Sequence, residues 1–200
     1  ATFSADGKRV VTASADGTAR IWNGQTGAAI GASLRHGAAV GTAAFSPDGQ
    51  RVLTASRDNT ARLWEVSSGR PAAPPLAHEA AVVQAAFSRD GNLIVTASQD
   101  KTARIWNAQT GKPVAPPLAH ASAVTSASFS ADGQAVVTAS EDGTARVWEV
   151  ATGREIAGPL QHDDTVGFAA FSADGQSVIT ASDDRTVRQW SVTNGRARAA

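Results

Sequence analysis

A hydroxyl, an imidazole, a carboxylate and an indole recur together along this chain of 200 residues. In one copy the residues are His36, Thr54 or Ser56, Asp58 and Trp64. A hydroxyl, an imidazole and a carboxylate can form a nucleophile with its general base and an orienting acid. The set occurs in four equivalent copies, however, whereas an active site needs one specialised copy beside a substrate pocket. The pattern therefore favours a structural hydrogen-bond network, because each buried polar group left unpaired costs roughly 1–3 kcal/mol.

The copies follow a strict interval of 42 residues. The interval is set by the five tryptophans, Trp22, Trp64, Trp106, Trp148 and Trp190. All four histidines keep it, as do five phenylalanines, five Asp-Gly pairs and five Thr-Ala-Ser runs. A fixed period of this size is typical of repeat architectures, so we interpret each copy as one structural unit.

Each unit divides into four short extended pieces. In the second unit they are residues 40–45, 51–56, 60–65 and 70–76, separated by turn residues such as Asp48-Gly49. Lengths of this kind and β-branched residues are typical of strands, so we expect a four-stranded antiparallel meander. The apolar residues of 51–56 do not alternate, which indicates that both faces of the sheet are covered. Proline recurs in the fourth piece, as at Pro74 and Pro159, and predicts an edge strand because proline cannot donate to a central ladder.

The repeated pattern His…Phe-Ser-x-Asp-Gly…Thr-Ala-Ser-x-Asp-x-Thr-Ala-Arg-x-Trp resembles the WD40 repeat over the whole chain. The family's usual Asp after the Trp is replaced, for example by Glu65, and its Gly before the His is replaced, for example by Arg35. The resemblance implies an all-β fold, a β-propeller segment of about five four-stranded antiparallel blades. We expect one propeller segment over 1–200, with repeats at 1–34 (incomplete), 35–76, 77–118, 119–160 and 161–200 (its outer strand cut short). We further expect an arc of a larger seven- or eight-bladed ring, with a closed five-bladed ring as the alternative.

The resemblance also implies that His, Thr, Asp and Trp form a tetrad inside each blade. The spacing alone leaves Thr54 and Ser56 as alternatives, since residues two apart on a strand share a face. The matching residues are His36, Thr54, Asp58 and Trp64; His78, Thr96, Asp100 and Trp106; His120, Thr138, Asp142 and Trp148; and His162, Thr180, Asp184 and Trp190.

Composition argues against several other functions. The 18 Lys and Arg balance the 18 Asp and Glu, which argues against nucleic acid or a membrane surface as partners. The repeated arginines, such as Arg62, could form a basic ring for polyanions, but we expect each to pack along its own blade. There is no cysteine, no signal segment and no apolar run long enough to span a membrane, so we predict a cytoplasmic location. We expect no cofactor and no metal, because equivalent histidines on packed sheets would lie roughly 10 Å apart, too far for one ion.

Residues that vary between otherwise constant repeats are the candidates for recognition. They flank the repeated Asp or follow the His, and both loops must lie at the same end of a blade if these two residues meet. The candidate partner-binding residues are Arg57, Asn59, Glu79, Gln99, Lys101, Glu141, Asp163, Asp164, Asp183 and Arg185. We therefore predict a non-catalytic scaffold that binds protein partners through this loop end.

Two other functions stay open from the sequence: a small-ligand or glycan-binding propeller, and a regulatory or sensor propeller attached to a signalling kinase or ATPase. We also expect self-association of the isolated chain, because unpaired sheet edges and apolar blade faces would be exposed.

Overall fold

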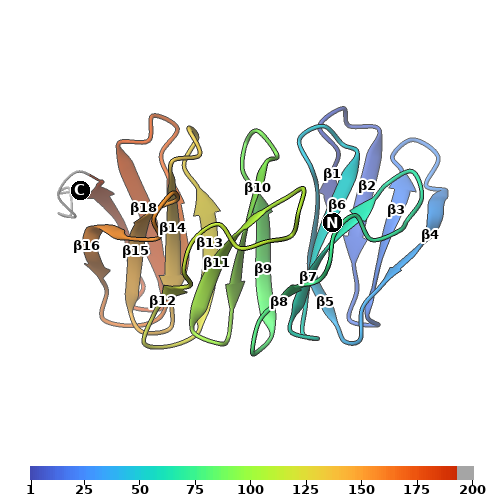
Figure 1. The fold of residues 1–200 in the computed structure, drawn as a ribbon. Helices are drawn as coiled ribbons and strands as arrows, with labels where there is room; N and C mark the ends of the chain where they lie inside the picture. Colours follow the sequence, from blue (N-terminus) through green and yellow to red (C-terminus); the bar gives the residue numbers. More distant parts are fainter. Residues whose placement is uncertain (193–200) are drawn as a thin grey trace.

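The computed structural model describes residues 1–192 of the chain. Within these residues the structure consists of β-strands joined by turns and loops, and it has no helix that could cross a membrane. The strands form five antiparallel sheets, which follow one another in chain order (Figure 1). We call the sheets blades 1 to 5. The all-β propeller segment predicted from the sequence is confirmed.

Every blade is a meander, with each strand paired to the next along the chain. Blade 1 contains β1 (Thr2–Phe3), β2 (Arg9–Ala13), β3 (Thr18–Asn23) and β4 (Ala29–Arg35). Blade 2 contains β5 (Val40–Phe45), β6 (Arg51–Ser56), β7 (Thr60–Glu65) and β8 (Leu76–Ala77). Blade 3 contains β9 (Val82–Phe87), β10 (Leu93–Ser98), β11 (Thr102–Asn107) and β12 (Leu118–Ala119). Blade 4 contains β13 (Val124–Phe129), β14 (Ala135–Ser140), β15 (Thr144–Glu149) and β16 (Glu155–Gln161). Blade 5, within the described residues, contains β17 (Val166–Phe171), β18 (Ser177–Ser182) and β19 (Val187–Ser191).

The first three strands of blade 2 occupy the residues predicted from the sequence, but the fourth is much shorter. The prediction of a strand over 70–76 is wrong in extent, because only Leu76–Ala77 pair with β7, apart from an isolated bridge at Pro71. Pro74 and Pro75 have no N–H to donate, so the ladder cannot continue through them. Blade 1 lacks proline at this place, and its fourth strand spans seven residues. The position of the fourth strand at the edge of the sheet is as predicted.

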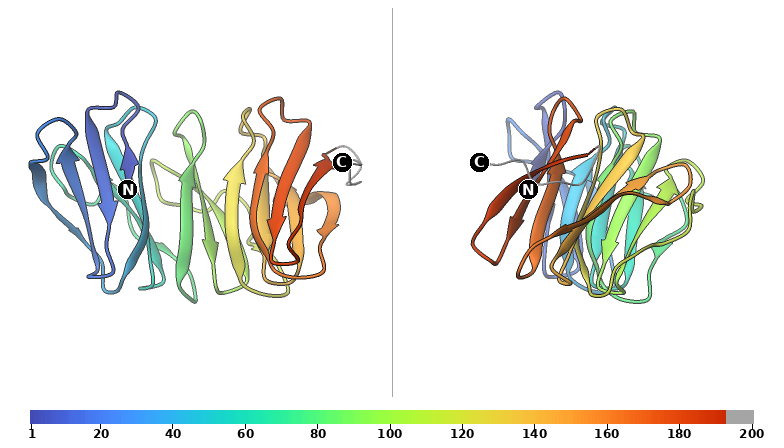
Figure 2. Two further views of the ribbon diagram at one scale, coloured as in Figure 1. Left: turned by 180° about the vertical axis from the view of Figure 1, so that it is seen from behind. Right: turned by 90° about the vertical axis from the view of Figure 1, so that its left-hand side faces the viewer.

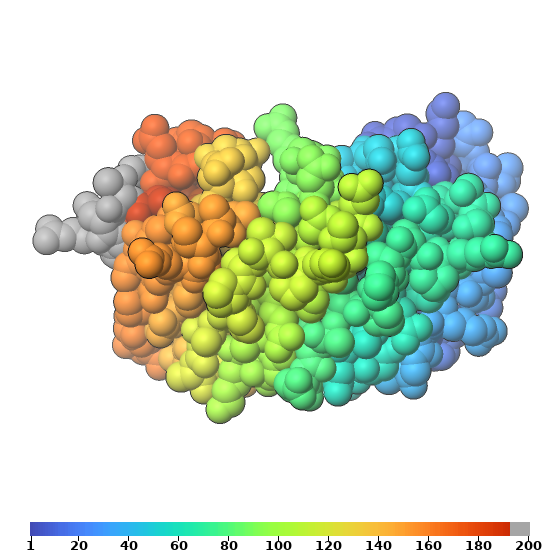
Figure 3. Space-filling view, viewed as in Figure 1, coloured from blue at the N-terminus to red at the C-terminus, as the bar shows by residue number. Residues whose placement is uncertain are grey.

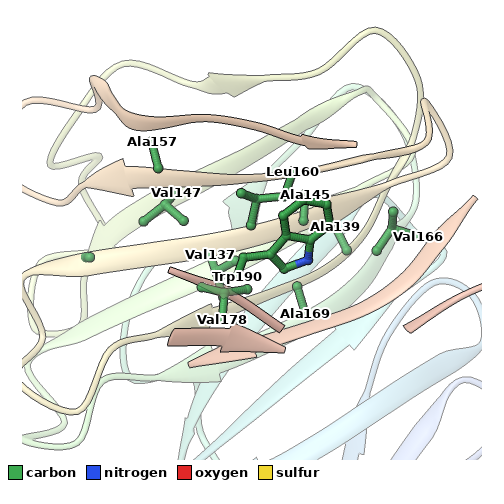
Figure 4. Packing of buried hydrophobic residues seen from close by; sticks show 11 residues of the cluster. Val137, Ala139, Ala145, Val147, Ala157, Leu160, Val166, Ala169, Val178 and Trp190 are labelled. Carbon is green, nitrogen blue, oxygen red and sulfur yellow. The ribbon is translucent and has the colours of Figure 1, made fainter. Parts of the chain in front are cut away.

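The core lies between the blades. In Figure 4 the indole of Trp190 on blade 5 lies against Val137, Ala145 and Leu160 of blade 4. These three residues of blade 4 are fully or almost fully buried. A large indole fits here because the facing sheet presents small and β-branched side chains, which lets the two sheets approach closely. Both faces of the inner blades are therefore covered, as the unbroken apolar runs predict.

The five blades form an open arc, with blades 1 and 5 at its two ends (Figures 1 and 2). The free face of blade 5 exposes Ile179 by 41% and Val187 by 71%, whereas the equivalent Val137 and Ala145 of blade 4 are at 0%. The chain thus does not close on itself as a five-bladed ring in this structure. Membership of a larger ring stays a prediction.

Candidate functional site

Two sets of loops meet at the lower end of the arc in Figure 1, which we call the histidine end. One set carries the His residues between consecutive blades, and the other is the turn between the second and third strands of each blade. In blade 2 the imidazole of His36 lies with Nδ1 2.9 Å from Asp58 Oδ2 and Nε2 2.7 Å from Thr54 Oγ1. The indole Nε1–H of Trp64 donates to the same Thr54 oxygen at 2.9 Å. The four side chains therefore form one continuous network.

The structure places threonine, and not serine, against the imidazole. Ser56 instead donates its hydroxyl to the carbonyl of Ala38 and accepts the amide N–H of Asp58. Blades 3, 4 and 5 repeat the arrangement, with His Nε2 at 2.7 Å from Thr96, Thr138 and Thr180. Their Asp–His distances are 2.8, 3.0 and 2.7 Å. All sixteen residues of the four tetrads are thus brought together as four separate networks.

The carboxylates of the networks are strongly acidic. Burial opposes the charge of Asp58, but hydrogen bonds from the Thr60 hydroxyl, the Gly37 amide and the His36 imidazole outweigh burial and lower its pKa to about 2. Equivalent contacts lower the pKa of Asp100 and of Asp142 to about 2. The pKa of Asp184 is lowered too, against burial, by hydrogen bonds from Thr186 and His162.

The protonation state of each network follows from its donors. An ionised carboxylate can only accept, so His36 must donate its Nδ1–H to Asp58. Burial lowers the pKa of His36, His78 and His120 below 6.5, against the opposing effect of the carboxylates, so these imidazoles are neutral at pH 7. Neutral Nε2 is then an acceptor, and the threonine hydroxyl donates to it while accepting the indole N–H.

This order of hydroxyl, imidazole and carboxylate is that of a catalytic triad, but the hydroxyl is not accessible. Thr54 is 0% exposed, and so are its three counterparts. No substrate atom can approach the oxygen, which already takes part in hydrogen bonds with the imidazole and the indole. The arrangement can hold two loops and a strand together, and it offers no nucleophile at the surface.

The candidate partner-binding residues surround these networks at the histidine end. Nine of the ten are exposed, and Asn59 is half-buried. They lie on different blades, so they form a row along the arc and not a single cluster. Three of them make side-chain contacts: Asp163 lies 3.7 Å from Arg188, Glu141 accepts the Ser122 hydroxyl at 3.5 Å, and Asp164 accepts the Thr165 amide at 2.7 Å.

The family described as "WD domain, G-beta repeat" matches residues 1–23, 31–65, 74–107, 111–149 and 155–191, which is most of the chain. The chain belongs to this family. Its repeats commonly form binding scaffolds and are typically non-catalytic.

A solved structure shares the fold of this WD-repeat chain. It is the crystal structure of the computationally designed Ika8 protein, with a TM-score of 0.88 and 28% sequence identity. The match covers 99% of this chain and 59% of the designed protein, so this chain spans little more than half of that propeller. A search of curated proteins finds no match.

In blades 2 and 5 the arginine two residues before the tryptophan contacts the network of its WD repeat. Arg62 and Arg188 place Nη2 at 3.4 and 3.2 Å from the carboxylates of Asp58 and Asp184. Their Nη1 groups donate to the backbone carbonyls of Arg35 and Gln161. In blade 4 the guanidinium pairs instead with Glu155 at 3.1 Å. These contacts within the fold favour the packing interpretation over a polyanion-binding ring.

Three of the candidate residues have a strained backbone, which sequence reasoning did not find. Asn59, Lys101 and Arg185 have φ of 68°, 70° and 68°, where the equivalent residues of blades 1 and 4 are glycine. A left-handed conformation costs an L-residue roughly 1–2 kcal/mol relative to its preferred regions. Lys101 and Arg185 are therefore held in a costly conformation on turns where glycine would fit freely.

Charge is divided along the histidine end. The first blade contributes Asp16 and Arg35 and the second contributes Arg57, all three exposed, and neither Asp16 nor Arg35 was among the predicted candidates. Blade 3 contributes both signs, and blades 4 and 5 are mainly acidic through Glu141, Asp163 and Asp183. Among residues 1–192 there is no group of three or more His, Cys, Asp or Glu placed to hold a metal ion. The surface is a bipolar strip made of side chains from successive blades.

Proposed function

We propose that this WD-repeat chain is a non-catalytic scaffold that binds a protein partner through the histidine end. The observation that carries the proposal is a set of exposed, varied side chains on turns whose backbone is fixed by buried networks. Asp58 illustrates it: one carboxylate oxygen accepts the Gly37 amide of the interblade loop, and the other accepts the Thr60 amide and hydroxyl of the turn. A single carboxylate thus fixes both loops of its blade. Loops held in one conformation lose less entropy on binding.

Three further features support this proposal. The only triad-like hydroxyls of the described tetrads are buried, which removes the nucleophile that an enzyme of this kind needs. The flanks of neighbouring blades that face each other are buried by packing. The strained backbone of Lys101 and Arg185 also supports a binding role for these turns, because backbone strain clusters at functional sites.

The partner presents patches of both signs in this proposal. Acidic groups of the partner face Arg57 and Lys101, and basic groups face Glu141 and Asp183. Exposed charges of this kind act mainly on the rate of encounter, since they steer approach before the surfaces meet.

The test is a charge reversal at the acidic part of the strip. Glu141→Lys combined with Asp183→Lys should slow association with a partner recovered on this chain by roughly tenfold at low salt, and weaken the salt dependence. The melting temperature should change little, because both side chains are exposed. Stopped-flow or surface-based kinetics over a salt series measures both quantities.

The matched control alters the outer edge of the blades. Arg70→Ala with Lys112→Ala changes two exposed residues that precede the short outer strands. Normal kinetics for this control are expected. Unchanged kinetics for the charge reversal, together with lost binding in the control, would move the site to the circumference and refute the proposal.

A further inference from the structure

The opposite end of the arc carries hollows between neighbouring blades. At this end, uppermost in Figure 1, the Asp-Gly hairpins connect the first and second strands, and we call it the hairpin end. Figure 3 shows these hairpins as separate projections along the upper edge. A hollow of about 350 to 380 Å³ lies there at each of the four interfaces between blades.

One repeat position contributes a side chain to the lining of every hollow. It is the first residue of the second strand in blades 1 to 4, and it recurs every 42 residues as Arg9, Arg51, Leu93 and Ala135. The next blade contributes a repeated phenylalanine to the apolar cluster of the same interface: Phe45, Phe87, Phe129 or Phe171. The position thus varies from a long cation to a methyl group while its aromatic neighbour stays constant.

At the first three interfaces a longer side chain occupies this position, and a hollow remains beside it. The guanidinium of Arg9 lies over the ring of Phe45, with 5.3 Å between Cζ and the ring centroid. Arg51 crosses to blade 3 and donates from Nη1 to the carbonyl of Ala108 at 3.0 Å. Leu93 packs against the apolar cluster that also contacts Phe129. The rings of Phe45, Phe87 and Phe129 are not among the residues that line the hollows at these interfaces.

Between blades 4 and 5 this position holds only a methyl group, that of Ala135. Ala135 is too short to cover the aromatic neighbour, and Phe171 becomes part of the wall of a hollow of about 370 Å³. Ile156 and Val192 extend the apolar wall, and the carboxyl-bearing residues Asp132 and Glu149 also line the hollow. An aromatic ring beside carboxylates favours the binding of a cation that has a flat or apolar surface.

We propose that this hollow binds an arginine side chain presented by an exposed segment of a partner protein. The guanidinium of the bound arginine lies above the ring of Phe171, as the guanidinium of Arg9 lies above the ring of Phe45. The carboxylates of Asp132 and Glu149 supply the opposite charge. Arginine is preferred to lysine, because the planar guanidinium stacks on an aromatic ring while also donating to carboxylates. This site is separate from the histidine end and does not depend on the function proposed for that end.

The test uses small probes on the full chain. In saturation-transfer difference NMR, acetyl-arginine methylamide should receive saturation from the protein, and acetyl-leucine methylamide and acetyl-glycine methylamide should receive much less. Equal transfer to the leucine probe would show a merely apolar hollow and overturn the proposal.

Three substitutions locate the signal. Ala135→Arg should abolish transfer to the arginine probe, because the new guanidinium takes the place above Phe171 that the guanidinium of Arg9 takes above Phe45. Arg9→Ala should increase transfer, because it uncovers the ring of Phe45 beside the hollow already present there. Glu149→Gln should reduce binding about threefold, as expected for a partly exposed ion pair. Full transfer to the Ala135→Arg protein would place the probe elsewhere and refute the site.

Discussion

Asp100→Ala should lower the free energy of unfolding of the WD-repeat arc by roughly 1–3 kcal/mol. The substitution removes the acceptor of the His78 Nδ1–H and of the Glu79 and Thr102 amides. The imidazole is buried with its other nitrogen engaged by Thr96, so the freed donor has no solvent to replace the carboxylate. Thermal and chemical denaturation of the purified variant and the parent measure the difference.

The matched control is Asp90→Ala in the hairpin turn of the same blade. Asp90 also accepts hydrogen bonds, from the Ser88 hydroxyl and the Asn92 amide, but it is exposed and water can replace it. We therefore expect a smaller loss of stability. A larger loss for Asp90→Ala than for Asp100→Ala would contradict the role assigned to the networks.

The second large effect is destabilisation by acid, in two stages. Since the pKa of His36, His78 and His120 is lowered in the fold, the unfolded chain takes up protons more readily below pH 6.5, and stability falls as the pH drops through that value. The pKa of Asp58, Asp100 and Asp142 is about 2, against 3.8 ordinarily. The stability they contribute is complete above about pH 4 and is lost as the pH falls towards 2.

Urea denaturation midpoints between pH 8 and pH 2 give the measurement. The midpoint should decline below about pH 6.5 and more steeply below pH 4. The Asp100→Ala protein should show a shallower acid limb than the parent, since it has one network fewer. A midpoint that stays flat or rises between pH 8 and pH 3 would show that the networks are not protonated as described.

Much of the fold was predictable because the repeat supplies the same signal five times. The strands of residues 40–45, 51–56 and 60–65 have turn residues at both ends, and local turn chemistry decides where a short strand ends. The meeting of the repeated His and Asp was predictable as well, through the resemblance to the family.

Other features depend on contacts that the repeat pattern does not encode. The choice of Thr54 over Ser56 depends on small differences in position along one face of a strand. The left-handed backbone of Lys101 gives no signal in its own side chain, and the signal lies in the equivalent residues Gly17, Asn59 and Gly143, whose types favour that conformation. Phe171 lines its hollow because the side chain of Ala135 is too short to cover the ring, and only packing between blades reveals this exposure.

The most direct test of the central claim is a hydrogen-exchange footprint of the chain with its recovered partner. The account predicts that bound partner slows amide exchange in the loops of the histidine end, at residues 57–60, 99–102, 141–144, 163–165 and 183–186. The outer strands around residues 70–77 and 112–119 should exchange as in the free chain. Protection confined to those outer strands, with the histidine end unchanged, would contradict the claim that this end is the binding surface.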